Sequence, residues 1–302
     1  MADPTPDTLR AYLAAGLPCE FLEVDGDGRH FFATIVSTAF EGLPRIDVPR
    51  GIQADLRTFA AFGVHGLSAI TAVTAQNTRG VDAIEVLPTA IVRAQIECVL
   101  EDFPVAAIKT GMLGTASLAR TVGNALAARP DIALIVDPVL VATTGAALSQ
   151  GRLAAAVSRH LLARADLLTP NLPEAEELLG QRIRSRTDMF EAARELRARG
   201  ARAVLLKGGH LAGPQVHDLL LGSGEARWYT HPRIDVEGHG TGCTLAAAIA
   251  AGMARGSGLE AAIEAAIAFV AQALALAYRP GKGSVVVLDQ LGARPVPEIR
   301  RP

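Results

Sequence analysis

From residue 51 onward, short apolar runs alternate with segments whose apolar residues recur at helical spacing. Continuous apolar strands joined by helices are typical of a parallel sheet that is covered on both faces. The sequence therefore predicts an α/β fold with a mainly parallel central sheet and helices on both faces. The runs expected as strands are LSAITAVTA, AAIKTGML, ALIVDPVL, AVLLKGG, VHDLLL, RWYTHPRID and GSVVVLD.

Composition and charge narrow the class of protein. Half of the 302 residues are apolar, 20% are charged, and the formal net charge is -2. This balance gives no electrostatic reason to bind nucleic acid or an anionic membrane. The first residues lack the pattern of a signal peptide, and the apolar run after Cys243 ends at Arg255. The widely spaced Cys19, Cys98 and Cys243 are expected to be free thiols in a reducing compartment, so we expect a cytoplasmic protein.

Polar residues follow several of the predicted strands. They occur in TAQNT, IKTGM, VDPV, LTPNLPE and LLKGGH, each directly after an apolar run. The carboxyl ends of parallel strands lie at one edge of a sheet, where ligands bind. One such turn alone would indicate only a local bend, but together they predict a pocket.

A glycine-rich stretch precedes an Ala-rich helical segment. Gly238, Gly240 and Gly242 alternate with other residues directly before Cys243. The first amides of a helix lack intrahelical partners, and glycines allow an anion to approach them. A thiol in that first turn is expected to have a lowered pKa and to act as a base. The structural alternatives are a tight turn for the glycines and a small buried residue for Cys243.

These motifs together resemble one enzyme family. GIQADLRTFAAFGVHGLSAITAVTAQNTRGV, IKTGMLGTA, VDPVLVATTGAAL, LLTPNLPEAEELLG, LLKGGH and HGTGCTLAAAIAAG are similar to the hydroxymethylpyrimidine/phosphomethylpyrimidine kinases of thiamine synthesis. The resemblance covers residues 51–290 and implies a ribokinase-like fold. It also implies an enzyme that uses ATP and Mg²⁺ to phosphorylate 4-amino-5-hydroxymethyl-2-methylpyrimidine and then its monophosphate, and that forms a homodimer.

The resemblance assigns roles on the substrate side of the pocket. Gln76 would recognise the aminopyrimidine, because an amide both donates and accepts hydrogen bonds. Met112 would form an apolar wall, and Asp55 of GIQADL would also face the substrate. Gly240, Gly242 and the amide of Cys243 would form an anion hole, with Cys243 as the catalytic base.

It assigns further roles on the nucleotide side. Asp137, Asn171 and Glu174 match the magnesium and phosphate region, where oxygens would bind Mg²⁺ through water. Lys207 and Thr241 would lie near the nucleotide phosphates. For Glu174 alone, an acid in a first helical turn is an equally ordinary interpretation.

The first 50 residues differ from this family. Residues 7–46 resemble the N-terminal part of a BolA-like module, with a helix expected over 7–16 and strands over 20–26 and 30–37. The family's first strand and glycine-rich substrate loop are absent from this segment. We therefore expect residues 30–36 to supply a strand to the sheet, and EGLPRIDVPR to cover the substrate less well than the usual loop. Cys19 and His30 are expected to be ordinary loop residues.

Two other functions stay open. Pyridoxal kinases share the superfamily and differ in substrate. The absent loop also leaves an inactive binding protein or a BolA-type iron–sulfur adaptor as alternatives, although the intact GTGC argues for activity.

Overall fold

The chain forms two units in a computed structural model, residues 1–47 and 48–302, which are described separately. The structure describes residues 51–140, 152–234 and 238–293, the strands at 21–26 and 31–36, and the single residues Asp7 and Ala11. In the N-terminal unit β1 (Phe21–Gly26) pairs antiparallel with β2 (Phe31–Val36). Both strand predictions are confirmed there. The helix expected over 7–16 lies almost wholly outside the described residues.

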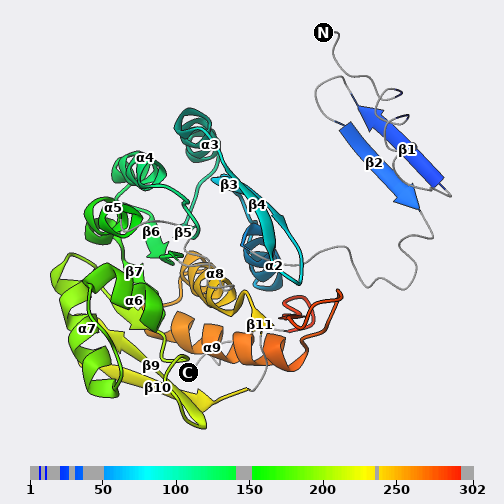
Figure 1. The fold of residues 1–302 in the computed structure, drawn as a ribbon. Coiled ribbons are helices and arrows are strands. Elements are labelled where there is room, and N and C mark those ends of the chain that lie inside the picture. The colour runs from blue at the N-terminus through cyan, green and yellow to red at the C-terminus, as the bar shows by residue number, and fades with distance from the viewer. Residues whose placement is uncertain are drawn as a thin grey trace, which may run out of the picture. The chain divides into compact units, whose positions relative to one another are not determined.

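The larger unit alternates strands and helices along the chain (Figure 1). Its elements are α2 (Ile52–Ala61), β3 (Ala72–Gln76), β4 (Val81–Val86), α3 (Thr89–Asp102), β5 (Ala107–Thr110), α4 (Ala116–Ala127), β6 (Ala133–Val136), α5 (Arg152–His160), η2 (Leu162–Arg164), β7 (Leu167–Leu168), α6 (Leu172–Leu179), α7 (Arg186–Ala198), β8 (Val204–Leu206), β9 (Gln215–Leu221), β10 (Arg227–Pro232), β11 (Gly238–His239), α8 (Thr241–Ala254), α9 (Leu259–Ala275) and β12 (Val286–Val287).

A six-stranded sheet forms the centre of this unit, in the order β10-β9-β8-β7-β6-β5. Strands β5 to β8 are parallel, whereas β9 and β10 run antiparallel to their neighbours. The predicted mainly parallel sheet is confirmed. Of the strands that the structure describes, β5 is the last on the parallel side of this sheet.

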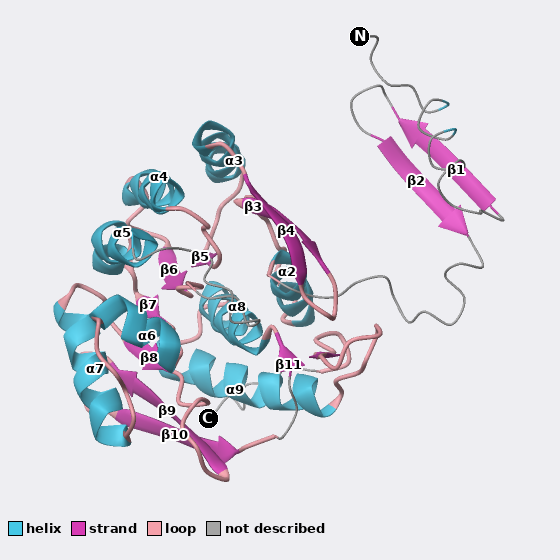
Figure 2. Ribbon diagram, in the orientation of Figure 1, coloured by secondary structure: helices cyan, strands magenta, loops and turns pink. Residues whose placement is uncertain are grey.

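Helices cover both faces of the sheet (Figure 2). Leu134 and Val136 of β6 pack with α3 to α7, whereas Ile135 between them packs with α2, α8 and α9. Alternate side chains of a strand point to opposite faces, so a strand in the middle of such a sheet must be apolar throughout. This is why the apolar runs identified these strands.

The strand expected over LSAITAVTA is shorter than predicted. It begins only at Ala72, and residues 64–71 form no helix or strand. The side-chain amide of Gln95 accepts a hydrogen bond from the Ile70 N–H and donates one to the Ile70 carbonyl, at 2.9 and 3.0 Å. β3 instead pairs with β4, which the sequence analysis did not predict, in a separate antiparallel hairpin. Among the described residues, no helix is both long and apolar enough to cross a membrane.

Candidate active site

Three polar side chains gather at the carboxyl ends of neighbouring strands, as predicted. Asp137 directly follows β6, Asn171 comes after β7, and Lys207 follows β8. Asn171 and Lys207 also form a parallel β-bridge, and the Lys207 N–H donates to the carbonyl of Pro170 at 2.9 Å. The backbone of the sheet therefore fixes where these side chains start.

Lys207 forms a buried ionic cluster with two carboxylates. Its Nζ lies 3.0 Å from Oδ1 of Asp137 and 3.9 Å from Oε2 of Glu174. Thr169 Oγ1 donates a hydrogen bond to the same oxygen of Asp137 at 3.1 Å. Burial disfavours ionisation of Asp137, but Lys207 and Lys109 outweigh it and hold the pKa of that carboxyl below its usual range. The cluster thus places one cation among two acids.

Glu174 also has a structural role. Its carboxylate accepts from the Asn171 N–H at 2.8 Å, and the Asn171 side chain accepts from the Glu174 N–H at 2.9 Å. This capping box begins α6 and supports the interpretation of Glu174 as a first-turn acid. Burial raises the pKa of Glu174 to about 7, although Lys207 acts in the opposite direction. The Glu174 carboxylate therefore belongs to the ionic cluster and also stabilises the N-terminus of α6.

The glycine stretch leads into a helix N-terminus, as predicted. Gly240 is the N-cap of α8 with a φ of 86°, a left-handed conformation that favours glycine. The first helical hydrogen bond joins the Thr244 N–H to the Gly240 carbonyl at 2.8 Å, so the amides of residues 241–243 precede it. A Cβ on Gly242 would lie 3.0 Å from Nζ of Lys207. The first turn of α8 therefore meets the ionic cluster at Gly242.

Cys243 lies in this first turn and is partly exposed. The prediction of a lowered pKa is wrong. Burial raises the pKa of the Cys243 thiol to about 12, with Asp137 and Asp55 adding to the effect and Lys109 and Lys207 opposing it. A helix N-terminus favours the thiolate, but the loss of water around the buried thiol acts in the opposite direction and is the larger effect.

A second buried ion pair borders the site. Lys109 Nζ donates to both carboxylate oxygens of Asp55, at 2.8 and 3.1 Å, and the two side chains are 3% and 14% exposed. Burial acts against the ammonium, but Asp55, Cys243 and Asp137 outweigh it and raise the pKa of Lys109. Asp55 was predicted as a site residue from the sequence, whereas Lys109 was not. The sequence did mark Lys109 in two ways. It lies in IKTGM, directly after an apolar run, and it is one of three lysines in the chain, with Lys207 and Lys282.

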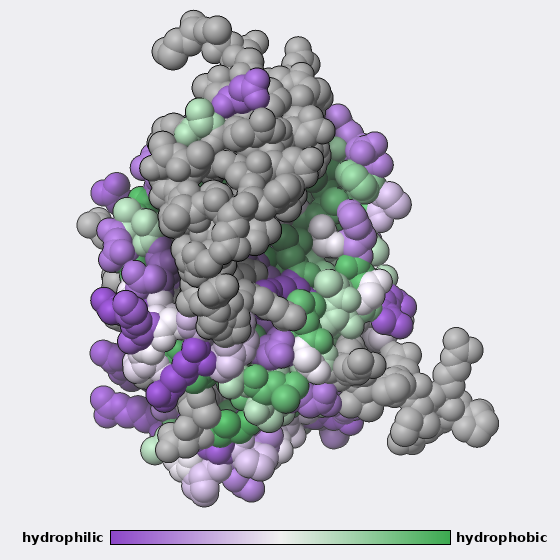
Figure 3. Space-filling view, turned by 90° about the vertical axis from the view of Figure 1, so that its right-hand side faces the viewer, coloured by the Kyte–Doolittle hydropathy of each residue, from purple (hydrophilic) through white to green (hydrophobic). Residues whose placement is uncertain are grey.

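A cavity of about 1120 Å³ joins the predicted substrate residues. Gln76, Met112, Asp55, Gly240 and Cys243 all line it. Seen from the side of the β3–β4 hairpin, hydrophobic surface lies beside polar surface (Figure 3). The cavity continues along the edge strand β5, between residues 67–71 and the side chains of α3. At the N-terminus of α8 the cavity is lined by Gly240 and Cys243, and most of its lining residues are apolar.

The residues predicted for the nucleotide side form a separate group. Asp137, Asn171, Glu174 and Lys207 are not among the described residues that line this cavity, and they meet α8 at Gly242. The first turn of α8 thus separates an apolar cavity from a charged cluster.

Comparison with known proteins places this arrangement in a family. Residues 50–288 match the family described as phosphomethylpyrimidine kinase. The chain belongs to the phosphomethylpyrimidine kinase family. A hydroxymethylpyrimidine/phosphomethylpyrimidine kinase of Streptomyces coelicolor is 46% identical over 201 residues, which are 66% of this chain and 74% of that kinase.

Two further relatives extend the comparison. The thiamine biosynthesis bifunctional protein ThiED of Geobacter sulfurreducens is 42% identical over 82% of this chain, which spans half of that longer protein. The pyridoxal kinase of Staphylococcus aureus, solved with AMP-PCP and pyridoxal, has a TM-score of 0.74 at 32% identity. That match covers 81% of this chain and 89% of the kinase. The predicted ribokinase-like fold is thereby confirmed. The resemblance of residues 7–46 to BolA-like proteins stays a prediction.

Proposed function

We propose that this member of the kinase family transfers a phosphoryl group from ATP to 4-amino-5-hydroxymethyl-2-methylpyrimidine and then to its monophosphate, in thiamine synthesis. One observation carries the proposal beyond family membership. Gln76 and Met112 line the same cavity as the glycine-flanked N-terminus of α8. A pyrimidine held by Gln76 and Met112 would therefore lie in the same cavity as the helix N-terminus that would hold the phosphoryl group.

The substrate side of the cavity suits an aminopyrimidine. The Gln76 amide both donates and accepts, so it matches an amino group beside a ring nitrogen. The Met112 side chain supplies an adaptable apolar wall. The cavity is mostly apolar with few polar groups, which is the usual character of a small-molecule site.

The phosphate side suits the transferred group. The amides of residues 241–243 at the positive end of α8 would stabilise the charge that develops on the phosphoryl oxygens. Lys207 lies against Gly242 and would bind the nucleotide phosphates, and the hydroxyl of Thr241 in the same helical turn would bind them as well. Phosphoryl transfer needs little covalent help from the protein, so positioning and charge are the main contributions.

Asp137 and Glu174 have the chemistry of a magnesium site. Both carboxylates lie around Lys207, and oxygen ligands are those that Mg²⁺ prefers. Among the described residues, no group of three or more His, Cys, Asp or Glu side chains is arranged to hold a metal. The two carboxylates would therefore hold a hydrated ion together with phosphate oxygens. A bound Mg²⁺ would neutralise phosphate charge.

Cys243 is proposed as the base that accepts the proton of the substrate hydroxyl. With a pKa near 12 the thiol is protonated in the empty site at neutral pH, so it must release that proton to solvent before it can accept the proton of the hydroxyl. The positive charges of Lys109 and Lys207 oppose the effect of burial and would make the thiolate more accessible. A thiolate of high pKa is also a strong base once it forms.

ATP turnover by the purified full-length chain tests the function. Consumption of ATP should depend on the hydroxymethylpyrimidine, and a second phosphorylation should follow with the monophosphate. ATP hydrolysis measured without the pyrimidine gives the background rate. Absence of pyrimidine-dependent turnover would contradict the proposal and favour an inactive binding protein or an iron–sulfur adaptor, which visible absorbance after co-purification with a glutaredoxin would identify.

A pyridoxal kinase is the second candidate, because the S. aureus pyridoxal kinase shares the fold at a TM-score of 0.74. Pyridoxal should be phosphorylated with a lower kcat/KM than the pyrimidine. A higher kcat/KM for pyridoxal would exchange the two assignments.

A homodimer in the cytoplasm completes the proposal. Val73 of β3 and Ile84 of β4 are 56% and 38% exposed, so the hairpin carries apolar surface that a second copy would cover. Light scattering of the purified chain measures this directly, and a monomer mass at micromolar concentration would contradict it.

A further inference from the structure

The β3–β4 hairpin carries Gln76 but lies outside the main sheet. Among the described residues, its two strands are paired with each other in a sheet of their own. At its base, the Leu87 N–H donates to the Thr71 carbonyl at 2.9 Å, and Thr71 Oγ1 donates to the Met112 carbonyl at 2.6 Å. An isolated two-stranded hairpin is marginally stable in water. The position of Gln76 therefore depends on contacts made by the rest of the hairpin.

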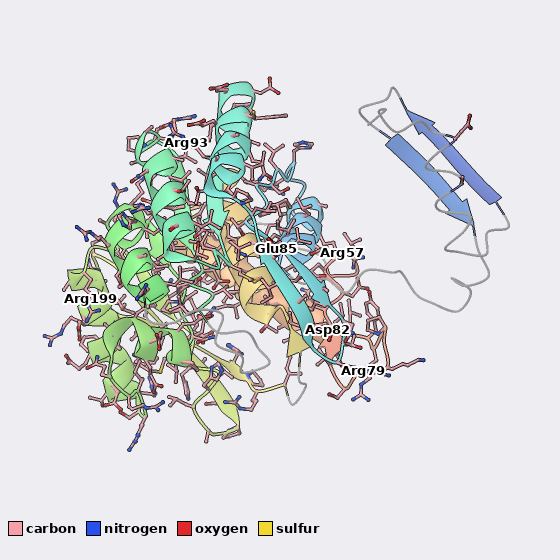
Figure 4. The ribbon with its side chains drawn as sticks, turned by 45° about the horizontal axis from the view of Figure 1, so that its top comes forward. Arg57, Arg79, Asp82, Glu85, Arg93 and Arg199 are labelled. Atoms are coloured by element: carbon pink, nitrogen blue, oxygen red, sulfur yellow. The ribbon has the colours of Figure 1, made fainter. Side chains whose placement is uncertain are left out.

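The outer side of the hairpin offers little to hold it. Arg79, Asp82 and Glu85 project from its tip and outer face in Figure 4, and all three are exposed. Exposed charged side chains contribute little to stability. Within one chain, the contacts that fix the hairpin must therefore come from its buried side.

Thr78 supplies such a contact at the tip of the hairpin. It is 5% exposed, and its Oγ1 accepts a hydrogen bond at 3.0 Å from the Gly283 N–H, 205 residues later in the chain. A Cβ on Gly283 would overlap the Thr78 carbonyl oxygen, and a Cβ on Gly281 would overlap the Thr78 hydroxyl. Both glycines therefore allow residues 280–284 to lie directly on the turn.

Residues 280–284 connect this contact to the phosphate side of the site. At the base of the loop, Tyr278 and Val287 exchange two backbone hydrogen bonds, at 3.0 and 2.8 Å. The following strand β12 pairs in parallel with β11, with Gly238 opposite Val286. β11 leads directly into Gly240, the N-cap of α8. A short path of backbone contacts thus joins Thr78 to the glycines that precede Cys243.

We propose that Thr78 is a positioning residue that fastens the substrate hairpin to the C-terminal glycine loop. The contact holds Gln76, two residues away, at the cavity and in a fixed position relative to the N-terminus of α8. This inference rests on the proposed function and deepens it. The same backbone contacts, through residues 280–284, then position Gln76 for substrate recognition and Gly240 for phosphate binding. The glycines of PGKGS serve that close approach, whereas Lys282 between them is exposed.

Steady-state kinetics with two independent variants test this inference. Thr78→Val keeps the shape of the side chain and removes the hydrogen-bond acceptor, and Gly283→Ala introduces the overlapping Cβ. Each should raise the KM for the pyrimidine by about three- to tenfold, the effect of one lost hydrogen bond, and leave the KM for ATP within about twofold. Thr78→Ser retains the hydroxyl and should restore the KM. Gly224→Ala is the matched control, because no atom lies within 4 Å of its added Cβ.

Hydrogen exchange of residues 72–86 in the substrate-free protein separates this inference from the proposed function. Thr78→Val and Gly283→Ala should speed exchange in the hairpin, while α7 and the parallel strands keep their protection. This readout is valid even if the wild-type protein phosphorylates no pyrimidine. Unchanged hairpin exchange in both variants would overturn the inference. Equal rises in KM for ATP and pyrimidine, with a lower melting temperature, would reduce Thr78 to a general structural role and also overturn it.

Discussion

Lys109 and Asp55 form a bidentate ion pair across 54 residues of sequence, with Nζ–O distances of 2.8 and 3.1 Å. Asp55 lies in α2, before the hairpin, and Lys109 lies in the edge strand β5. Both side chains are largely buried and line the cavity that contains Cys243. The pair therefore joins α2 to the sheet and places a cation where it opposes the raised pKa of the thiol.

Lys109→Met should destabilise the fold, because it leaves the Asp55 carboxylate buried and unpaired. Removing one partner of a buried pair costs about 3–5 kcal/mol. The double variant Asp55→Asn/Lys109→Met should recover much of that loss, since neither charge remains. Urea denaturation followed by circular dichroism measures both free energies of unfolding.

The exposed pair of Arg93 and Glu97 is the matched control for this prediction. Arg93→Met removes the same kind of contact from the surface of α3 and should leave the denaturation midpoint unchanged. A double variant as unstable as Lys109→Met would show that apolar packing around the pair, and not the unpaired charge, determines the loss.

Cys243→Ala should lower kcat by about 10²–10⁴-fold, the usual contribution of a general base, with little change in the KM for ATP. The fold should persist, because alanine fits in the first turn of an Ala-rich helix. Cys98→Ala, at an exposed position of α3, is the control and should keep the wild-type kcat. Near-normal turnover by Cys243→Ala would leave the residue with a packing role.

The reactivity of the Cys243 thiol should report its raised pKa. The thiolate is the nucleophile, so the rate of alkylation follows the fraction ionised. Because burial raises the pKa to about 12, that fraction and the rate should rise by about tenfold per pH unit from pH 7 to pH 10 without a plateau. Iodoacetamide labelling in a Cys19→Ser/Cys98→Ser background measures it, with a free thiol, whose pKa is about 8.5 and whose rate levels off by about pH 10, as reference. A plateau below pH 8 would contradict the effect of burial.

Gln76→Ala should weaken binding of the pyrimidine and leave ATP binding unchanged, because Gln76 lines the cavity and not the charged cluster. An unsatisfied ring edge in a buried site costs about 1–3 kcal/mol, or roughly 5- to 150-fold in Kd. Calorimetry with each ligand separates the two effects. Gln53, an exposed residue that also lines the cavity, is the control position, and Gln53→Ala should bind the pyrimidine more tightly than Gln76→Ala. Equal affinities of the wild type and Gln76→Ala would remove this role.

The sequence allowed most of the central fold to be predicted, because each parallel strand is buried on both faces and so is apolar throughout. β4 was missed for the opposite reason. Its segment VDAIEV contains Asp82 and Glu85, and four of its six residues are exposed in a hairpin outside the main sheet. Nothing within that segment indicates that Thr78 beside it is buried by a loop 205 residues away.

The site was predictable where a local motif determines it. The glycine stretch gave the helix N-terminus, and the turns after the apolar runs gave Asp137, Asn171 and Lys207. The pairing of Lys109 with Asp55 depends on how α2 packs beside β5, which no local pattern contains. The pKa of Cys243 was missed because burial is a property of the assembled fold, and it opposes the expected effect of the helix terminus.

One edge of β5 bears on the prediction that residues 30–36 supply a strand to the main sheet. Among the described strands β5 pairs on one side only, with β6, and its residues Ala107 and Ile108 line the cavity together with residues 67–71. Backbone groups left unpaired there cost about 1–3 kcal/mol each when buried. β1 pairs with one edge of β2, and a strand has two edges.

Trypsin cleavage of the full chain at Arg45 or Arg50 tests this last prediction. If residues 30–36 join the sheet, the N-terminal fragment should stay bound after cleavage. Its removal in mild denaturant should lower the melting temperature of the remainder and promote aggregation through the exposed edge strand. Size-exclusion chromatography followed by thermal denaturation measures both effects, with cleavage after Arg300, beyond the last described residues, as the control for nicking. Release of residues 1–45 from a remainder of unchanged melting temperature would show that the segment folds apart from the sheet.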